Sequence, residues 1–256
     1  TGGFSTHDLS FAYFENHSIL LISIIFMILG SFPFLVLAKT NIKNPFAAFK
    51  DHQVKIFLLL LFISICLIYF FAQKYLIGSE IQKIIIISFN TISIISGTGF
   101  ISENFEGWGN YASTLFLILM FIGGCAGSTT GGIKIFRFQI LFKFIAIHLK
   151  KMLQPHAVIA SHFNGKKIQD STYESVMIFF FLYITTFAIS ALLLSFSGLD
   201  FLTCVSAAAS AISNVGPGLG DIIGPEGNYS TLSDYSKTIL TATMFLGRLE
   251  MLTILI

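Results

Sequence analysis

Three short segments of this sequence could place backbone carbonyl oxygens around a cation. Each is centred on a glycine, and they read "TGGFS" at 1–5, "GTGFI" at 97–101 and "NVGPG" at 214–218. Glycine adopts backbone angles that other residues avoid, so such a segment can turn successive carbonyl oxygens in one direction. Rings of carbonyl oxygens can replace the hydration shell of a cation. A segment of this kind needs other elements to hold it in position.

Two of these segments follow apolar stretches that are too short to cross a membrane, 82–96 and 201–213. Backbone that leaves a helix at membrane depth is tolerated only where it is buried in protein or lines a watery cavity. The sequence therefore predicts re-entrant hairpins, in which a short helix enters the membrane and an extended strand returns. The helix directs the negative end of its dipole toward the glycine segment. In one hairpin, the carbonyls of Gly97, Thr98 and Gly99 would face the ion.

The composition places the chain in a membrane. Hydrophobic residues make up 54% of it and charged residues 11%, whereas soluble domains carry about 25% charged residues. The mean hydropathy is +0.81. A membrane-spanning helix needs about 20 apolar residues. Apolar stretches that reach or approach this length lie at 18–38, 56–77, 111–123, 133–149, 173–197 and 237–256.

The distribution of charge assigns the two sides of the membrane. Lysine and arginine concentrate in two connections, 39–55 and 134–172. Both are predicted to be cytoplasmic, because cytoplasmic loops carry an excess of these residues. The glycine breaks then open outward, on the side that holds three lysines and nine acidic residues: Lys74, Lys83, Lys237, Asp8, Glu15, Glu80, Glu103, Glu106, Asp200, Asp221, Glu226 and Asp234. These carboxylates are either simply solvated or, as we favour, form a mouth that concentrates cations.

The glycine segments recur with the same order of elements around them, which indicates an internal repeat. Gly3, Gly99 and Gly216 are separated by 96 and 117 residues. Each unit reads as helix, pore loop and helix in the same direction, so the predicted fold is an all-α membrane protein built from pore-loop repeats. The chain is expected to be a fragment of a longer protein, divided into a repeat end at 1–38, a cytoplasmic loop at 39–55, a repeat with a broken helix at 56–150, a cytoplasmic loop at 151–172 and a last repeat at 173–256.

A glycine-rich stretch, "GGCAGSTTGG" at 123–132, interrupts what would otherwise be one long helix. It predicts a flexible polar plug at mid-membrane depth, and a passive kink is the alternative. Its glycine and hydroxyl residues are Gly123, Gly124, Gly127, Ser128, Thr129, Thr130, Gly131 and Gly132. A phosphate-binding loop is excluded, because Ile133 separates Gly132 from Lys134 where that motif needs them adjacent.

Arg248 is a charged residue in an otherwise apolar stretch. It lies about 17 Å along a helix from Lys237, at 1.5 Å per residue, which predicts a position near mid-depth. Intramembrane charges are costly and normally face a cavity. Glu250 is two residues away and would project from a different helix face, so it is a poor partner. A structural salt bridge with another residue is the alternative to a position on a pore.

These segments resemble the Trk/Ktr/HKT superfamily of potassium transporters, in particular its TrkH-type subunits. The similar residues extend over the whole chain: "TGGFSTHD" at 1–8, "SGTGFIS" at 96–102, "FIGGCAGSTTGGIKIFR" at 121–137, "ISNVGPGLG" at 212–220 and "FLGRLEMLTI" at 245–254. The resemblance implies four potassium-channel-like repeats around one pore, of which this chain holds the second filter loop through to the last helix. It implies that the filter is lined by Thr1, Gly2, Gly3, Gly97, Thr98, Gly99, Asn214, Val215 and Gly216.

One residue departs from the pattern of this family. Gly97 stands where these filters often have threonine, so a hydroxyl that could add an inner ligand is lost. The backbone carbonyl remains, and we expect looser selectivity at most.

The resemblance also implies a function: potassium uptake across the bacterial inner membrane by a multi-pass protein. The 123–132 segment would be an intramembrane gate loop, and Arg248 would line the pore beneath the filter and help to gate it. The expected partners are the potassium ion, membrane lipid, a ring of TrkA-like nucleotide-binding subunits and a second copy of the pore subunit. Potassium at the filter is the expected metal, with neither a covalently bound cofactor nor nucleic acid.

Two other functions are weighed against this one. A cation symporter with broken helices binds its substrate at half-helix ends, but it predicts inverted repeats. An intramembrane hydrolase could use Ser128 as its nucleophile and would need a histidine or lysine base at membrane depth. The sequence shows no nucleophile–base pair, metal cluster or phosphate cradle, so we do not expect an enzyme.

Overall fold

The computed structural model describes residues 3–7, 9–14, 16–40, 48–154, 162–163 and 166–250. Its α-helices are α1 (His17–Gly30), α2 (Phe34–Ala38), α3 (His52–Ala72), α4 (Glu80–Ile95), α5 (Asn110–Met120), α6 (Ile135–Leu153), α7 (Asp170–Ser195), α8 (Phe201–Ser213) and α9 (Asp234–Arg248). Short 3-10 helices are η1 (Ser10–Tyr13), η2 (Ala48–Lys50), η3 (Phe105–Trp108) and η4 (Tyr229–Thr231). The predicted all-α architecture is confirmed, with the addition of an antiparallel hairpin of two-residue strands, β1 (His162–Phe163) and β2 (Lys166–Lys167).

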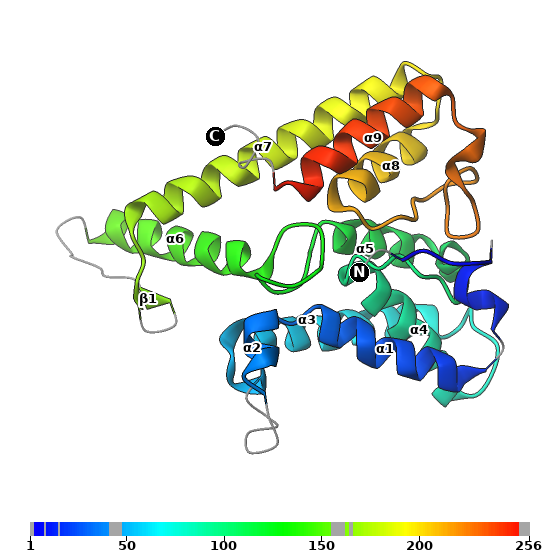
Figure 1. The fold of residues 1–256 in the computed structure, drawn as a ribbon, viewed down its shortest axis with the longest axis horizontal. Helices are drawn as coiled ribbons and strands as arrows, with labels where there is room; N and C mark the ends of the chain where they lie inside the picture. Colours follow the sequence, from blue (N-terminus) through cyan, green and yellow to red (C-terminus); the bar gives the residue numbers. More distant parts are fainter. Residues whose placement is uncertain are drawn as a thin grey trace.

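The helices form two groups with α5 between them (Figure 1). One group contains α1, α3 and α4, and the other contains α7, α8 and α9. Helix α5 contacts α3 and α4 on one side and α8 on the other, so it joins the two groups. Helix α6 packs against α7 and extends away from both groups toward the hairpin (Figure 1).

The two short helices α4 and α8 lie inside the protein. Each begins at a side-chain cap: Ser79 and Gln82 form a capping box at the start of α4, and Asp200 accepts the N–H of Thr203 at the start of α8. Such caps satisfy N–H groups that the first turn of a helix leaves free. Small alanine and serine side chains are buried along α8, which lets α7 and α9 pack closely on it. The greater part of each short helix is therefore buried in protein, as expected for re-entrant hairpins, while the N-terminal turns are partly exposed.

Both short helices have equivalent neighbours. Helix α4 packs against α3, which precedes it, and α5, which follows it, while α8 packs in the same way against α7 and α9. Each also touches the helix that ends the preceding unit, since α1 contacts α4 and α5 contacts α8. The units therefore follow one another in the same direction around a common centre.

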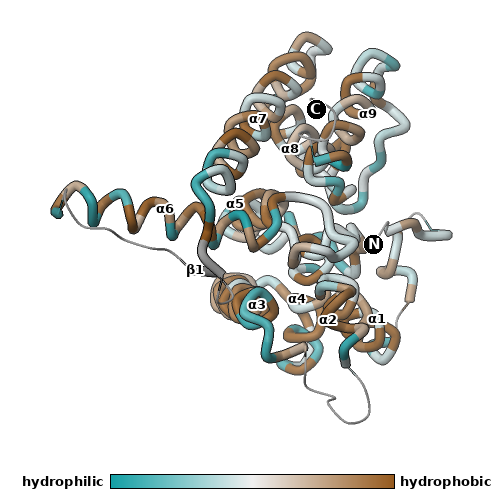
Figure 2. Tube along the Cα trace, turned by 60° about the vertical axis from the view of Figure 1, so that its left-hand side comes forward, coloured by the Kyte–Doolittle hydropathy of each residue, from teal (hydrophilic) through white to brown (hydrophobic). Residues whose placement is uncertain are grey.

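The helix surfaces suit a lipid environment. Two described helices, α3 and α7, are long and apolar enough to cross a membrane, and α1, α5 and α8 are shorter apolar helices. The hydrophobic colour runs along most of α1 and α7 in Figure 2. Large apolar side chains are exposed on these helices, including Phe26 on α1, Phe62 on α3 and Phe181 on α7.

The stretch predicted as one helix at 18–38 is two helices. Helix α1 ends at Gly30, and Pro33 is the N-cap residue of α2. The break leaves carbonyls without helical partners, and the glycine-rich loop supplies them: Thr129 donates from its N–H and hydroxyl to Gly30, and the N–H of Cys125 donates to Ser31. The single-helix prediction was wrong because proline cannot continue the backbone ladder and because this loop supplies other partners.

The helix predicted at 237–256 also differs. Helix α9 starts earlier, at Asp234, and ends at Arg248, after which Glu250 has a positive φ of 53°. Residues 251–256 of the predicted span lie outside the described residues. Arg248 is therefore the last residue of its helix rather than a residue in the middle of a longer one.

Asn90 generates a prediction about the stability of the first hairpin. This fully buried side chain donates to the hydroxyl of Ser102 at 3.0 Å and accepts the N–H of Ser102 at 3.2 Å. In the full-length parent of this chain, Asn90→Ala should destabilise the protein by about 1–3 kcal/mol, because it leaves a backbone N–H without its partner. The measurement is the apparent melting temperature in detergent. The matched control is Asn110→Ala, at an exposed asparagine, and equal melting temperatures of the two variants would contradict the prediction.

Candidate functional site

Equivalent hydrogen bonds connect the glycine segments at 97–99 and 214–216 to the C-terminal turns of α4 and α8. The N–H of Thr98 donates to the carbonyl of Ser93 at 2.9 Å, and the N–H of Val215 donates to the carbonyl of Ser210 at 3.0 Å. Each bond reaches five residues back along the chain. Asn214 reverses the chain after α8 with a left-handed backbone, φ 54° and ψ 44°. Two loops far apart in the sequence thus leave their helices in the same manner.

Three glycine segments meet through contacts that exclude any side chain. A Cβ built on Gly3 would lie 1.5 Å from the carbonyl oxygen of Thr98, and one on Gly99 would lie 2.1 Å from that of Val215. The φ angles of Gly3, Gly99 and Gly216 are +56°, +78° and +119°, which L side chains rarely adopt. A Cβ on Gly216 would have its nearest neighbour 3.9 Å away, at the Cα of Gly99. The first and second segments therefore each contact the carbonyl that precedes the central glycine of the next segment. The central glycine of the third segment has no such contact.

The segments that follow the glycine motifs are hydrogen-bonded to their short helices. Ser102 is held by the side chain of Asn90, and Leu219 is held by the hydroxyl of Ser206, which accepts the Leu219 N–H at 2.9 Å and donates to its carbonyl at 3.1 Å. Different side chains thus perform the same task in the two hairpins.

Some of the outer carboxylates predicted to form a cation-concentrating mouth have structural partners. Glu106 accepts the N–H of Gly220 at 2.6 Å, which links the outer part of one hairpin to the loop that follows the next. Glu103 accepts the indole N–H of Trp108 at 3.4 Å. Glu106 thus holds a backbone N–H and Glu103 holds a side chain, so these two carboxylates have structural roles.

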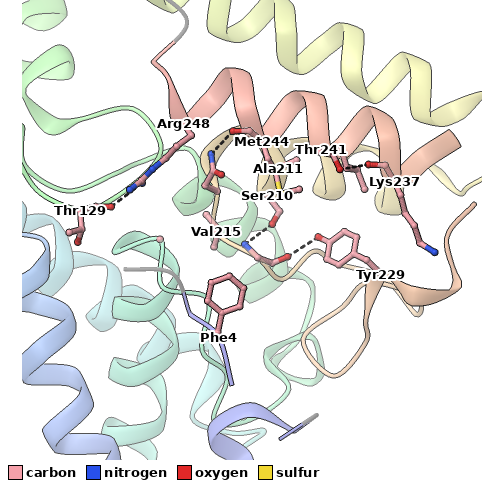
Figure 3. A pocket seen from close by; sticks show the side chains of 14 residues that line it. Phe4, Thr129, Ser210, Ala211, Val215, Tyr229, Lys237, Thr241, Met244 and Arg248 are labelled. Atoms are coloured by element: carbon pink, nitrogen blue, oxygen red, sulfur yellow. Dashed lines mark hydrogen bonds between the residues drawn. The ribbon is translucent and has the colours of Figure 1, made fainter. Parts of the chain in front are cut away.

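A cavity of about 720 Å³ runs along one side of the glycine segments (Figure 3). It extends from Tyr229 in η4 and Lys237 on α9, past Gly216 and Asn214, to Arg248 at the end of α9. Its lining combines backbone from the loops with side chains from α9. Among the described residues, no cluster of histidine, cysteine, aspartate and glutamate could hold a metal ion, so an ion here would rely on carbonyl and hydroxyl oxygens.

The glycine-rich loop between α5 and α6 is closed at its base by backbone bonds. The N–H of Gly123 donates to Ile133, and the N–H of Ile133 donates to Phe121, both at 2.9 Å. Farther along, the N–H of Ala126 donates to the side chain of Gln53 at 3.0 Å. These bonds give the loop, which the sequence predicts to be a flexible polar plug, a defined hydrogen-bonded shape.

The loop lies directly against the ends of α4 and α8. A Cβ on Gly131 would come 2.0 Å from the carbonyl oxygen of Ser213, the last residue of α8. A Cβ on Gly97 would lie 3.2 Å from the N of Gly131 and 3.7 Å from the carbonyl oxygen of Asn214. The threonine that the family often has in place of Gly97 would therefore crowd this loop, and the φ of +62° at Gly97 disfavours it further.

Charged residues gather beside this loop. The ammonium of Lys134, whose residue is only 7% exposed, donates to the carbonyl and hydroxyl of Thr130. Arg137 forms an ion pair with Glu250, and its guanidinium carbon lies 3.8 Å from the ring centroid of Phe179. Both basic residues belong to the 134–172 connection that the sequence predicts to be cytoplasmic, and the structure adds that they lie against the loop and α7.

Arg248 connects α9 to the same loop. Its guanidinium donates to the carbonyl of Thr129 at 3.1 Å (Figure 3). Within the described part of the chain Arg248 forms no ion pair, and Glu250 is engaged by Arg137 instead. A second cavity, of about 230 Å³, lies at this contact and is lined by Ser128, Thr130, Gly131, Gly132, Lys134, Gly247, Arg248 and Glu250.

Comparisons with known proteins identify the family. The TrkH family model, described as "Cation transport protein", matches residues 1–256. The chain belongs to the TrkH family.

Among its relatives, the Trk system potassium uptake protein TrkI of Halomonas elongata is 39% identical over 100% of this chain and 52% of its own length. The Escherichia coli K12 protein TrkH is 32% identical over 100% of this chain and 53% of its own length. The crystal structure of the potassium transporter TrkH from Vibrio parahaemolyticus superposes with a TM-score of 0.90 at 31% identity, covering 99% of this chain and 54% of that one. The chain spans about half the length of the curated relatives it matches.

Family membership fixes the class of protein. TrkH proteins are cation transport proteins of membranes and not enzymes. The fold, in which re-entrant hairpins repeat in one direction, agrees with the structural relative from Vibrio parahaemolyticus. The resemblance inferred from the sequence motifs is therefore confirmed for this TrkH-family chain.

The structure brings most of the site residues expected from the sequence into one region. Thr1 and Gly2 lie outside the described residues. The other seven filter residues lie in the three glycine segments, and the loop that contains Gly123, Gly124, Gly127, Ser128, Thr129, Thr130, Gly131 and Gly132 lies beside them. Sequence reasoning missed Lys134, Arg137, Glu250 and Tyr229 as parts of the site. For Lys134 the available signal was its place directly after the glycine-rich loop, whereas nothing in the sequence pairs Arg137 with Glu250.

Gly131 generates a prediction about how the loop packs. In the full-length parent, Gly131→Ala should lower the apparent melting temperature, because the added methyl would meet the Ser213 carbonyl at 2.0 Å and overpacking costs about 1–3 kcal/mol. The matched control is Gly107→Ala, where nothing lies within 4 Å of the new Cβ. If Gly131→Ala melts at the same temperature as this control, the loop does not pack against α8 as described.

Proposed function

We propose that this chain contributes three of the four filter loops of a potassium-selective pore that takes up potassium across a bacterial inner membrane. The observation that carries the proposal is the contact between successive glycine segments, where Gly3 meets the Thr98 carbonyl and Gly99 meets the Val215 carbonyl. These contacts gather backbone oxygens from separate hairpins in one region. The names of the relatives, which are potassium uptake proteins, support potassium as the ion.

Ion selection in this proposal is made by the backbone. A potassium ion approaching from the outer, acidic side loses water to the carbonyl oxygens of the glycine segments, which replace its hydration shell. The filter residues are Thr1, Gly2, Gly3, Gly97, Thr98, Gly99, Asn214, Val215 and Gly216. The C-terminal ends of α4 and α8 support the ion from beneath with their negative dipole ends.

The gate in this proposal is the loop at 123–132 together with Arg248. The loop lies against the last residue of α8, and Arg248 holds the carbonyl of Thr129. A positive charge at this depth opposes the passage of a cation while the loop is closed. Movement of the loop away from the filter would carry the Arg248 contact with it and open the path inward.

The division into repeats belongs to the same proposal. Residues 1–38 end the second repeat, 56–150 form the third and 173–256 form the fourth, with 39–55 and 151–172 as cytoplasmic loops. A further repeat that brings its own filter loop would occupy the open side of Gly216. The basic connections favour a cytoplasmic position, and they offer a surface for TrkA-like nucleotide-binding subunits. The pore subunit is expected to form a homodimer within the lipid bilayer.

The rival functions fit the geometry less well. A symporter with inverted repeats is disfavoured because α3–α4–α5 and α7–α8–α9 follow one another in the same direction. For hydrolysis, Ser128 would need a base, but its hydroxyl bonds to the Cys125 carbonyl and to Thr130, and the ammonium of Lys134 is bound to Thr130.

Gly99 tests the filter. In cells that lack their own potassium systems, the full-length parent should restore growth at low potassium. Gly99→Ser should abolish this growth or admit sodium, because the residue has a φ of +78° and the Val215 carbonyl lies 2.1 Å from any added Cβ. Potassium and sodium uptake measure the effect, with Gly107→Ala as the control. Uptake and selectivity equal to those of the control would show that this segment does not select ions.

Arg248 tests the gate. Arg248→Gln should raise potassium flux through the purified full-length protein in liposomes without regulatory subunits. The change removes a positive charge from the path and the bond that holds Thr129. A hydrogen bond to a charged group contributes about 1.5–3 kcal/mol, so roughly a tenfold rise or more is expected. Lys74→Gln, at an exposed outer lysine, removes the same charge away from the loop and should leave the flux unchanged. A flux at or below that of Lys74→Gln would contradict the gating role.

A further inference from the structure

The peptide of Gly216 is held from two sides. Its N–H donates to the hydroxyl of Ser210 at 3.0 Å, and its carbonyl accepts the hydroxyl of Tyr229 at 2.7 Å (Figure 3). Ser210 is 2% exposed and belongs to α8, whereas Tyr229 begins η4 in the loop beyond the filter segment. A side chain 13 residues farther along the chain therefore reaches back to a filter carbonyl.

The equivalent glycine of the preceding hairpin is held differently. The N–H of Gly99 donates to the backbone carbonyl of Ser93 at 3.3 Å. Within the described residues, no hydrogen bond reaches the carbonyl oxygen of Gly99. In this part of the chain the two glycines therefore differ, because the carbonyl of Gly216 has a protein donor and that of Gly99 has none.

Tyr229 is well fixed for this task. Its ring packs against the apolar cluster around α8, which includes Ala207 and Leu240. The next residue, Ser230, is anchored by the ammonium of Lys237, which donates to its carbonyl at 2.8 Å. Burial raises the pKa of the Tyr229 phenol to about 12, so the hydroxyl keeps its proton and remains a donor throughout the physiological range.

Gly216 itself depends on such support. Its φ of +119° is a conformation that residues other than glycine rarely adopt. Because glycine has few steric limits on its backbone angles, the direction of its carbonyl depends on the hydrogen bonds that fix the peptide. Discrimination between potassium and sodium depends on the number of carbonyl dipoles around the ion and on their field strength.

We propose that Tyr229 is a positioning residue that fixes the Gly216 carbonyl and thereby sets how well the filter discriminates potassium from sodium. A carbonyl oxygen has two lone pairs, so the bond from Tyr229 leaves one available to the ion while holding the direction of the dipole. This inference rests on the proposed filter function and adds to it a specificity determinant outside the glycine segments.

The test compares Tyr229→Phe with the full-length parent. The variant retains the ring and its packing and removes the hydroxyl alone. Uptake of potassium and of sodium, each over a range of concentrations, gives the selectivity ratio. Tyr229→Phe should lower this ratio roughly two- to tenfold, the range that corresponds to the net contribution of one hydrogen bond. The matched control is Tyr235→Phe, at a tyrosine that is 49% exposed on α9, and it should leave the ratio unchanged.

The outcomes separate this inference from the proposed function. If Gly99→Ser abolishes selective uptake but Tyr229→Phe has the same ratio as Tyr235→Phe, the filter stands and the role of Tyr229 is overturned. A lower melting temperature of Tyr229→Phe with an unchanged ratio would also overturn it, since the hydroxyl would then be structural alone. If Tyr229→Phe does not accumulate in cells, Ser210→Ala is measured in its place, because it removes the hydrogen bond to the N–H of Gly216. A reduced ratio in Ser210→Ala supports the inference and an unchanged ratio overturns it.

Discussion

Backbone that leaves a helix inside a bilayer has no water to satisfy its N–H and C=O groups, and most of this structure follows from that constraint. The chain breaks its helices at α1, after α4, between α5 and α6, and after α8. The backbone groups that these breaks leave free are hydrogen-bonded elsewhere in the protein. Carbonyls at the end of α1 accept hydrogen bonds from the glycine-rich loop, and the loops after α4 and α8 donate N–H groups to carbonyls of their own helices. In the proposed filter, the remaining carbonyl oxygens are those available to an ion.

Two glycines of the proposed filter, Gly3 and Gly99, have a second role besides their backbone angles. Each lets the carbonyl of the following segment approach to a distance that a methyl group would exclude. The conformation of one hairpin is consequently transmitted to the next by direct contact, without a side chain between them. This is why residues such as Gly3 and Val215, more than 200 positions apart in the chain, belong to one site.

Much of the site could be predicted from the sequence, because length and polarity carry the signal. The stretches at 82–96 and 201–213 are too short to span and lead into breaks that contain glycine, and the structure has α4 and α8 there. The break in α1 could have been predicted from Pro33. The pairing of Arg137 with Glu250, the bond from Tyr229 to Gly216 and the shape of the loop at 123–132 depend on tertiary contacts, so local pattern could not reveal them. The end of α9 at Arg248 could not be predicted, because no proline or other helix-ending signal follows it in the sequence.

The contact between Gly131 and the carbonyl of Ser213 has a thermodynamic consequence. The loop and the filter segment share one boundary at the end of α8, so a displacement of either changes the free energy of the other. Linkage makes such an effect reciprocal: if the position of the loop alters the affinity of the filter for its ion, occupancy of the filter biases the loop by the same free energy. An ion bound in the filter would then shift the position of the loop that controls its own passage, through the contact between Gly131 and Ser213.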